Sequence, residues 1–393
     1  MAVKKIIKNP TLNLALFAVA FIFTERSLRE MFLFSFSYRM MTVHTILTTA
    51  FSWAAIALFL YKVFLSKHRK IGNGILPIYG YILIFVFYFV STLVNSGNIS
   101  RWADDFIYSL AAILLLSLPE DRKAEISICS WVYLIAAALN ILCELITPVK
   151  NYMGLWREDF FIGFENAVGW SLLIGMLFSL LDYKKSGNKI KFAIYILLFF
   201  ANQLMCFCAT AVVGALIILI YLVFPFIRNA FEKWNFLVFL GIVAVLFVLL
   251  VFFYGALSEL PFVKFVVEDV LGKDITMSGR LYVWNGIVPE ALKKPLLGHG
   301  FGDSTNYFYE SSIWNHGYVH AHNEWLQTVY EGGFLTLAAG IIMTALCASK
   351  VKSREVKMIL FTLLIMLQSD MIAYYPWYLV TLVCEVGLIE ADK

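Results

Sequence analysis

The chain has 393 residues, of which 61% are hydrophobic, 17% aromatic and only 15% charged. These proportions exclude an ordinary soluble globular protein, in which about a quarter of the residues are charged. The apolar runs reach roughly 17 to 25 residues, the length that a helix needs to cross about 30 Å of hydrocarbon, and the alternation typical of barrel strands is weak. The sequence therefore predicts an all-α integral membrane protein. The net charge of +4 gives no indication of a nucleic-acid partner.

Hydropathy predicts about twelve transmembrane helices. The basic start of the chain is similar to a signal peptide, but no small-residue cleavage site precedes Glu25 and Arg26, so we expect a retained helix. Residues 1–254 should hold the first nine helices, residues 255–322 a large loop with short helices, and residues 323–393 the last three. The predicted helices lie near residues 9–24, 41–65, 76–95, 103–118, 126–147, 166–181, 190–206, 208–227, 235–254, 324–348, 356–372 and 374–390.

Basic residues are distributed unevenly between the two sets of connections. If the N-terminus is cytoplasmic, the connections on its side hold most of the 31 lysines and arginines, including Lys62, Arg122, Lys184, Arg228 and Arg354. Cationic loops stay in the cytoplasm. The pattern therefore predicts that both termini are cytoplasmic and that the long connection between the ninth and tenth helices is extracytoplasmic.

Two short helices are predicted in this outer loop. Residues 261–271 have a broad apolar face, which is typical of a helix lying on the membrane surface. Further on, Ser278 is a candidate N-cap for a helix with Arg280 in its first turn. A guanidinium beside free backbone N–H groups favours a phosphate or diphosphate, since arginine offers a planar fork of donors. The alternative is that Arg280 only reaches toward lipid headgroups.

The glycine-rich segment 298–302 follows that helix. It lacks a preceding strand and the Gly-Lys-Ser/Thr ending, so it predicts neither a dinucleotide site nor a nucleotide-binding P-loop. We expect a turn that returns the chain toward the membrane.

Three histidines, His316, His320 and His322, lie just before the tenth helix. Histidine takes up a proton near neutral pH, so a general base at the membrane surface is one interpretation. Asn323 is a candidate cap that would hold His322 at the mouth of the bundle. A metal site with Glu324 is an alternative, although its spacing differs from that of zinc helices. Surface histidines without chemistry are the third possibility.

The His322 and Asn323 pair, followed after nine residues by Gly333, resembles the C-terminal signature of the O-antigen ligase and O-antigen polymerase superfamily. The surrounding order is also similar, with Ser-Gly-Arg at 278–280, Trp284 and the glycine-rich turn before the His-Asn pair. The close resemblance covers about residues 276–340. Over the rest of the chain, the number and spacing of the predicted helices agree with this family.

The resemblance implies a fold similar to that of lipid-dependent (GT-C type) glycosyltransferases, in the bacterial cytoplasmic (inner) membrane. Such proteins are metal-independent inverting enzymes without a cofactor, and their donor is a glycan on undecaprenyl diphosphate. By this analogy His322 would accept the proton of an acceptor sugar hydroxyl, and Arg280 would neutralise the departing diphosphate. The implied partners are the lipid-linked glycan donor, an acceptor glycan or lipid A core, membrane lipid and, as a further candidate, a chain-length regulator.

One departure concerns the second diphosphate anchor. Family members often carry Ser-Arg at the start of the eighth helix, where this chain has no arginine. Arg157, Arg101 or Lys150 in other outer loops are the candidates to replace it, unless the anchor is missing. The expected substrate-binding residues are therefore His320, Asn323, Arg157, Arg101, Trp284, Thr210 and Asp370.

The signature does not separate a polymerase of lipid-linked repeat units from a ligase that transfers finished glycan to lipid A core. We favour the polymerase, because the outer loops hold few cations to meet a phosphorylated core. A secondary transporter is a further alternative, which predicts two similar halves, discontinuous helices and charges near the bilayer midplane. A membrane protein without enzymatic activity is the last.

Overall fold

The computed structural model describes residues 10–25, 38–65, 74–118, 121–146, 161–206, 208–270, 272, 274–277, 279–303, 320–370 and 377–391. These residues form helices joined by turns, and no β-strand occurs among them. Helices occur where hydropathy predicts them. They are α2 (Pro10–Thr24), α5 (Tyr38–Leu60, continued by the π-helical turn Tyr61–Leu65), α6 (Ile75–Val94), α7 (Ile99–Leu116), α8 (Arg122–Ile146), α9 (Glu165–Ser186), α10 (Lys189–Cys206), α11 (Ala209–Val223), α12 (Pro225–Lys233), α13 (Phe236–Phe252), α18 (Glu324–Lys350), α19 (Arg354–Met366) and α20 (Tyr378–Ala391).

The connection between α13 and α18 contains short helices, as expected. They are α14 (Tyr254–Leu257), α15 (Pro261–Lys264, continued by the π-helical turn Phe265–Val270) and α16 (Arg280–Ala291). The helix predicted at residues 261–271 is therefore confirmed as a helix. Its position on a membrane surface, and the division of the chain at residues 254 and 322, stay predictions.

Among the described helices, six are long and apolar enough to cross a membrane, or seven if the bent pair α11 and α12 forms one span. The helices α2, α13 and α20 are apolar but shorter. The chain is thus an all-helical, multi-pass membrane protein. Twelve spans remain a prediction.

The predicted helix at residues 208–227 is wrong in its second part. Helix α11 ends at Val223, and α12 leaves it at an angle of 97°. The cause is Pro225, which lacks an N–H donor and keeps the residue before it, Phe224, out of the helical conformation (φ −100°, ψ 110°).

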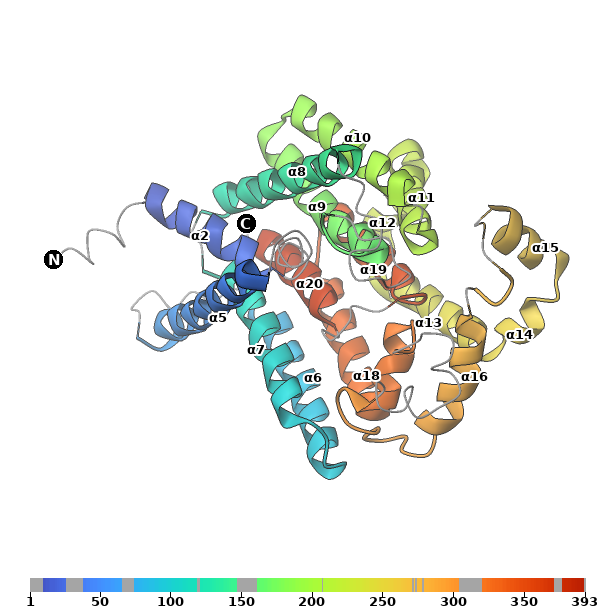
Figure 1. The fold of residues 1–393 in the computed structure, drawn as a ribbon. Coiled ribbons are helices and arrows are strands. Elements are labelled where there is room, and N and C mark those ends of the chain that lie inside the picture. Colours follow the sequence, from blue (N-terminus) through green and yellow to red (C-terminus); the bar gives the residue numbers. More distant parts are fainter. Residues whose placement is uncertain are drawn as a thin grey trace.

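A central group of α9, α19 and α20 is surrounded by the other helices (Figure 1). Residues 167–182 of α9 are buried, and its Gly175 allows Tyr133 of α8 and Tyr195 of α10 to approach closely. The surrounding helices expose large apolar side chains, such as Leu197 and Leu204 of α10. An apolar exterior around a packed centre is what a lipid bilayer requires.

Basic residues from the connections predicted to be cytoplasmic gather at one end of the bundle. Lys184 pairs with Glu355 at the start of α19, and Arg354 pairs with Glu232 at the end of α12. The segment 320–324 lies at the other end of α19, because the Glu324 N–H donates to the Leu367 carbonyl. The structure therefore separates a basic end from the end that holds the histidines.

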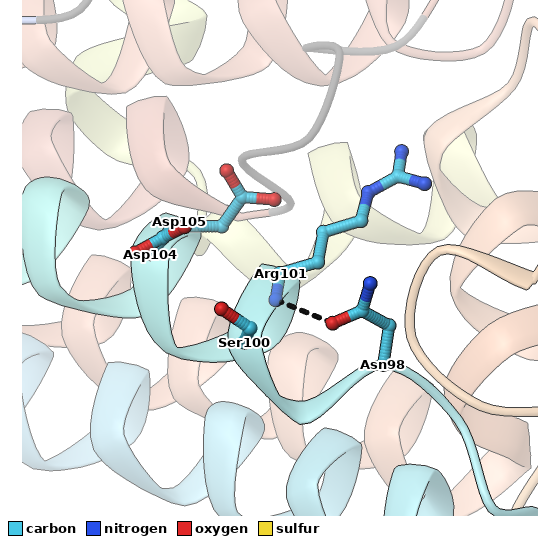
Figure 2. Close-up of a pocket in the computed structure, with 5 residues that line it drawn as sticks. All are labelled: Asn98, Ser100, Arg101, Asp104 and Asp105. Carbon is cyan, nitrogen blue, oxygen red and sulfur yellow. Dashed lines mark hydrogen bonds between the residues drawn. The ribbon is translucent and has the colours of Figure 1, made fainter.

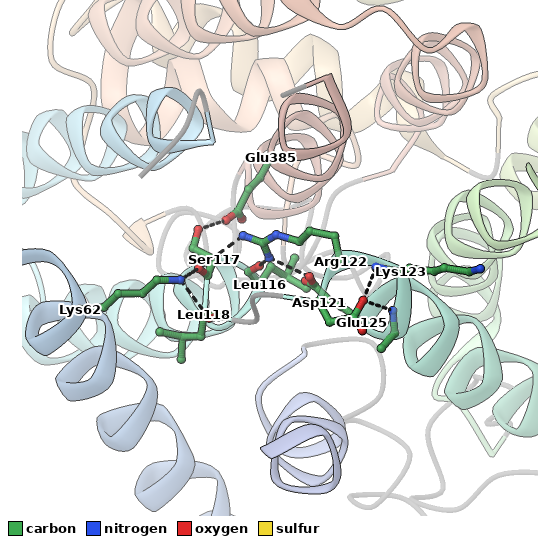
Figure 3. Close-up of polar contacts among 10 residues, drawn as sticks. Lys62, Leu116, Ser117, Leu118, Asp121, Arg122, Lys123, Glu125 and Glu385 are labelled. Atoms are coloured by element: carbon green, nitrogen blue, oxygen red, sulfur yellow. Dashed lines mark hydrogen bonds and ion pairs between the residues drawn. The ribbon is translucent and has the colours of Figure 1, made fainter. Parts of the chain in front are cut away.

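The basic end also closes the C-terminus of α7 (Figure 3). The Lys62 ammonium donates to the carbonyls of Ser117 and Leu118, and Arg122 donates to the Leu116 carbonyl and to Glu125. These cations satisfy carbonyl groups that have no partner within the helix. Lys62 and Arg122 therefore have a structural role.

Helix α18 is broken at Gly333, which has φ 72° and ψ 178°. Residues of the outer loop bond to the backbone groups that the break leaves without helical partners. The N–H groups of Phe334 and Leu335 donate to the carbonyls of Pro295 and Leu296. In the other direction, the N–H groups of His299 and Gly300 donate to carbonyls of α18. A Cβ atom at Gly333 would lie 2.1 Å from the Leu296 carbonyl oxygen. Only glycine fits this position, because it tolerates the positive φ and the close backbone.

Replacing Gly333 with alanine should therefore destabilise the protein by about 2–4 kcal/mol, through the positive φ and the clash with Leu296. Thermal unfolding of the purified protein in detergent measures this. Gly241→Ala is the matched control, because a Cβ atom at Gly241 in α13 would have no neighbour within 4 Å. If both variants unfold at the temperature of the wild type, the break at Gly333 does not stabilise the fold.

Candidate functional site

Arg280 is the first residue of α16, as predicted, but the cap before it is not the one expected. Gly279 is the N-cap, with φ 84°. Ser278 itself lies outside the described residues. The positive φ of a glycine turns the chain into α16, and the first N–H groups of the helix donate to the carbonyls of Met277, Thr276 and Gly279.

The guanidinium of Arg280 is held by two carbonyl groups. Its Nε donates to the Ser369 carbonyl at 2.9 Å, and its Nη1 donates to the Met277 carbonyl at 2.9 Å. The Nη2 atom donates to none of the described residues, and the side chain is half-buried. Arg280 is therefore positioned by its inner nitrogens, and its outer N–H groups remain able to bind an anion.

Ser369 connects Arg280 with the start of α11. Its hydroxyl lies 3.0 Å from the hydroxyl of Thr210, one of the predicted substrate-binding residues. Two residues before Thr210, the Cys208 thiol donates to the amide oxygen of Asn166 in the first turn of α9. The start of α9 and the start of α11 thus meet beside the end of α19.

His320 and His322 form a close pair, with ring centroids 4.0 Å apart. The backbone N–H of His322 donates to His320 Nδ1 at 3.3 Å, so this nitrogen of His320 acts as an acceptor. His322 has φ 48°, in the left-handed region that a residue with a side chain seldom adopts. Strain of this kind persists only where the surroundings determine the backbone, and it is frequent at functional sites.

Asn323 is the N-cap of α18, which confirms the sequence prediction. Its Oδ1 accepts the N–H of Leu326 at 2.9 Å. Its Nδ2 donates to the Gln368 carbonyl at 2.8 Å, so the same side chain ties the start of α18 to the end of α19. The amide is completely buried, and these bonds give it a structural role; its contact with substrate stays a prediction.

Trp284 links Arg280 to the histidines. It lies one turn after Arg280 on α16, and its Nε1 donates to the Ala321 carbonyl at 2.9 Å. The indole is completely buried, and its role in substrate binding stays a prediction. Through Ser369 and Ala321, one helix therefore brings Arg280 and His322 to the same end of the bundle.

The N-terminal ends of α9, α11, α16 and α18 all meet at the C-terminal end of α19, through the contacts given above. Helix N-termini carry partial positive charge, which favours an anion. Asp370, expected to contact the acceptor, lies in the same group and is 3% exposed. The site thus combines one guanidinium, several helix N-termini and a buried carboxyl group.

Arg101 is not brought to this group by any contact among the described residues. It lies in the first turn of α7, where its Nη1 donates to the Gly302 carbonyl at 3.2 Å. It lines a pocket together with Asn98, Ser100, Asp104 and Asp105 (Figure 2). Arg157, Lys150 and His316 lie outside the described residues. No replacement for the absent second arginine is thus identified.

Glu324, the carboxylate of the alternative metal arrangement, makes a contact of its own. The Glu324 carboxylate accepts the backbone N–H of Trp377 at 3.1 Å and is 1% exposed. Within the described ranges, no three His, Cys, Asp or Glu side chains are grouped so that they could hold a metal ion. Glu324 thus serves to attach α18 to the start of α20.

Residues 194–341 match the family model described as O-antigen ligase. The match covers less than half of the chain and supports the resemblance of this part to the O-antigen ligase and O-antigen polymerase superfamily. The match runs from the middle of α10 to the first residues after the break in α18, so it contains Arg280, His322 and Gly333. Ser369 and Asp370 lie beyond the end of the matched residues. Neither a curated protein nor a solved structure matches the chain.

Proposed function

We propose that this protein is an inverting glycosyltransferase that polymerises oligosaccharide repeat units carried on undecaprenyl diphosphate, on the outer side of the bacterial cytoplasmic membrane. The family match supports a membrane enzyme of surface-polysaccharide synthesis that uses lipid-linked glycan. The observation that carries the proposal is a set of three hydrogen bonds. Arg280, at the start of α16, is bonded to the end of α19, and the segment that holds His322 is bonded both to α16 and to the end of α19.

The reaction needs a base and an anion-binding group. A hydroxyl oxygen of the acceptor sugar attacks the anomeric carbon of the donor and passes its proton to His322. The bond from that carbon to the diphosphate breaks, and its electron pair leaves with the phosphate oxygen. Arg280 and the helix N-termini stabilise the charge that develops there. In this scheme the guanidinium supplies the positive charge, and no cofactor takes part.

The remaining predicted residues take smaller roles in the proposal. His320 lies against the His322 ring, and we assign it to contact with the acceptor. Thr210 lies against Ser369, on the side of the diphosphate-binding group, and we assign Asp370 to the acceptor. Membrane lipid surrounds the bundle, and a chain-length regulator is a further candidate partner.

The transporter alternative gains one of its expected features, the discontinuous helix α18. The carbonyl groups at the break are, however, already bonded: that of Tyr330 accepts from His299, and that of Glu331 accepts from Gly300 and from the Ser91 hydroxyl. Transporters use such carbonyls to coordinate ions. The occupied carbonyls favour a structural break.

The purified wild-type protein in liposomes, supplied with undecaprenyl-diphosphate repeat units, tests the proposal. We expect longer lipid-linked chains without any lipid A core. Transfer that occurs only after lipid A core is added would identify a ligase. No transfer to either acceptor would contradict the proposed activity.

A further inference from the structure

Ala321, between the two histidines, is held at both of its peptide groups by side chains. Its carbonyl accepts from Trp284 Nε1 at 2.9 Å, and its N–H donates to Gln327 Oε1 at 2.8 Å. Ala321 and Trp284 are completely buried, and Gln327 is 3% exposed. The backbone that carries the His320 and His322 rings is therefore fixed from two directions.

The amide of Gln327 has a defined orientation. Its Nε2 donates to Glu331 Oε1 at 2.7 Å, one turn further along α18. The nitrogen end therefore faces the carboxylate and the oxygen end faces the Ala321 N–H. The backbone of Glu331 is itself anchored, because its carbonyl accepts from Gly300 and Ser91 just before the helix break.

The conformation of His322 requires such support. Its positive φ of 48° is disfavoured for a residue with a side chain. The residue before it is held by Gln327 and Trp284, and the residue after it, Asn323, is held by Leu326 and Gln368. Without the Gln327 bond, the His322 backbone could relax and redirect the imidazole.

We propose that Gln327 is a positioning residue that sets the direction of the His322 imidazole through the backbone of Ala321. It is buried and acts through another residue. This role rests on the proposed function, in which His322 accepts the proton. A small displacement of such a group costs on the order of 100-fold in rate.

A helix-stabilising pair of Gln327 and Glu331 would be the simpler explanation, and the NMR signal of the His322 ring separates it from positioning. An exchange of the two residues tests whether the loss of the hydrogen bonds, rather than of packing, causes the effect. In Gln327→Glu combined with Glu331→Gln, the carboxylate at position 327 accepts the Ala321 N–H. The amide at position 331 donates to that same carboxylate. Both hydrogen bonds persist, and only the one between residues 327 and 331 reverses its direction. In Gln327→Leu, both are lost.

The experiment has two readouts in nanodiscs. The first is kcat and KM for transfer: we expect Gln327→Leu to lower kcat by roughly 10- to 100-fold with KM changed less than about threefold, and the exchange variant to recover most of the rate. The second is the NMR signal of the His322 ring, assigned as the one of six histidine signals that His322→Asn removes. It should shift or broaden in Gln327→Leu and return in the exchange variant.

Thr344→Val is the matched control, because it removes a buried hydrogen bond to the Gly340 carbonyl on α18, beyond the break at Gly333. An unchanged His322 signal in Gln327→Leu would overturn the positioning role, whatever reaction the protein catalyses. So would an exchange variant that leaves the signal as altered as Gln327→Leu does. Lack of transfer by the wild type would contradict the proposed function alone, since the NMR readout needs no activity.

Discussion

Replacing His322 with asparagine should lower kcat for glycan transfer by roughly 10²- to 10⁴-fold, the usual contribution of a general base. Asparagine suits this test because it tolerates the left-handed backbone that His322 adopts (φ 48°). It cannot accept the proton of the acceptor hydroxyl. Steady-state transfer by purified protein, together with binding of undecaprenyl diphosphate, measures the effect.

Binding of the lipid diphosphate should stay close to that of the wild type, since Arg280 is untouched. His320→Asn is the matched comparison: His320 Nδ1 already accepts the N–H of His322, so we expect a smaller loss of kcat. A His322→Asn protein with wild-type kcat, or a larger loss for His320→Asn, would contradict the assignment of His322 as the base.

Replacing Arg280 with alanine should lower kcat/KM by roughly 10²- to 10³-fold, because the charge on the departing diphosphate loses its main electrostatic partner. Arg280→Lys should recover only part of this. A lysine ammonium has no planar fork, so it cannot donate to the carbonyls of Ser369 and Met277 in the present geometry while it binds phosphate. Transfer kinetics and binding of undecaprenyl diphosphate measure both variants.

Lys293→Ala, just after the end of the same helix, is the control, since Lys293 is exposed and pairs with the nearby Glu290, an arrangement that contributes little. It should retain wild-type kinetics. Equal losses in Lys293→Ala and Arg280→Ala would indicate damage to α16 as a whole. Thermal unfolding of each variant separates loss of folding from loss of chemistry.

The positions of the helices could be predicted because apolar runs of membrane length are visible in the sequence without tertiary information. The start of α18 was predictable for a local reason: Asn323 precedes the apolar run and caps it through its own side chain. The placement of Arg280 in the first turn of α16 was also local. The pair His322 and Arg280 came from the resemblance, and their roles stay proposals.

Features that depend on distant segments could not be predicted in this way. The break at Gly333 is filled by residues 295–300 of the outer loop, and a glycine doublet was its only local signal. The bond from Gln327 to Ala321 depends on how the loop folds back on its own helix. The bend at Pro225 could have been predicted from the proline itself, but the hydropathy criterion does not take proline into account. Ser278 was a reasonable cap by type, but the chain turns at Gly279 instead.

The most direct test is a structure of the protein with undecaprenyl diphosphate bound in a nanodisc. We expect diphosphate oxygens within about 3 Å of the Arg280 guanidinium, beside the end of α19, with the His322 ring facing the same space. The contrary result would be a diphosphate in the pocket around Arg101, or at the basic end near Lys62 and Arg122, while Arg280 contacts only the carbonyls of Ser369 and Met277.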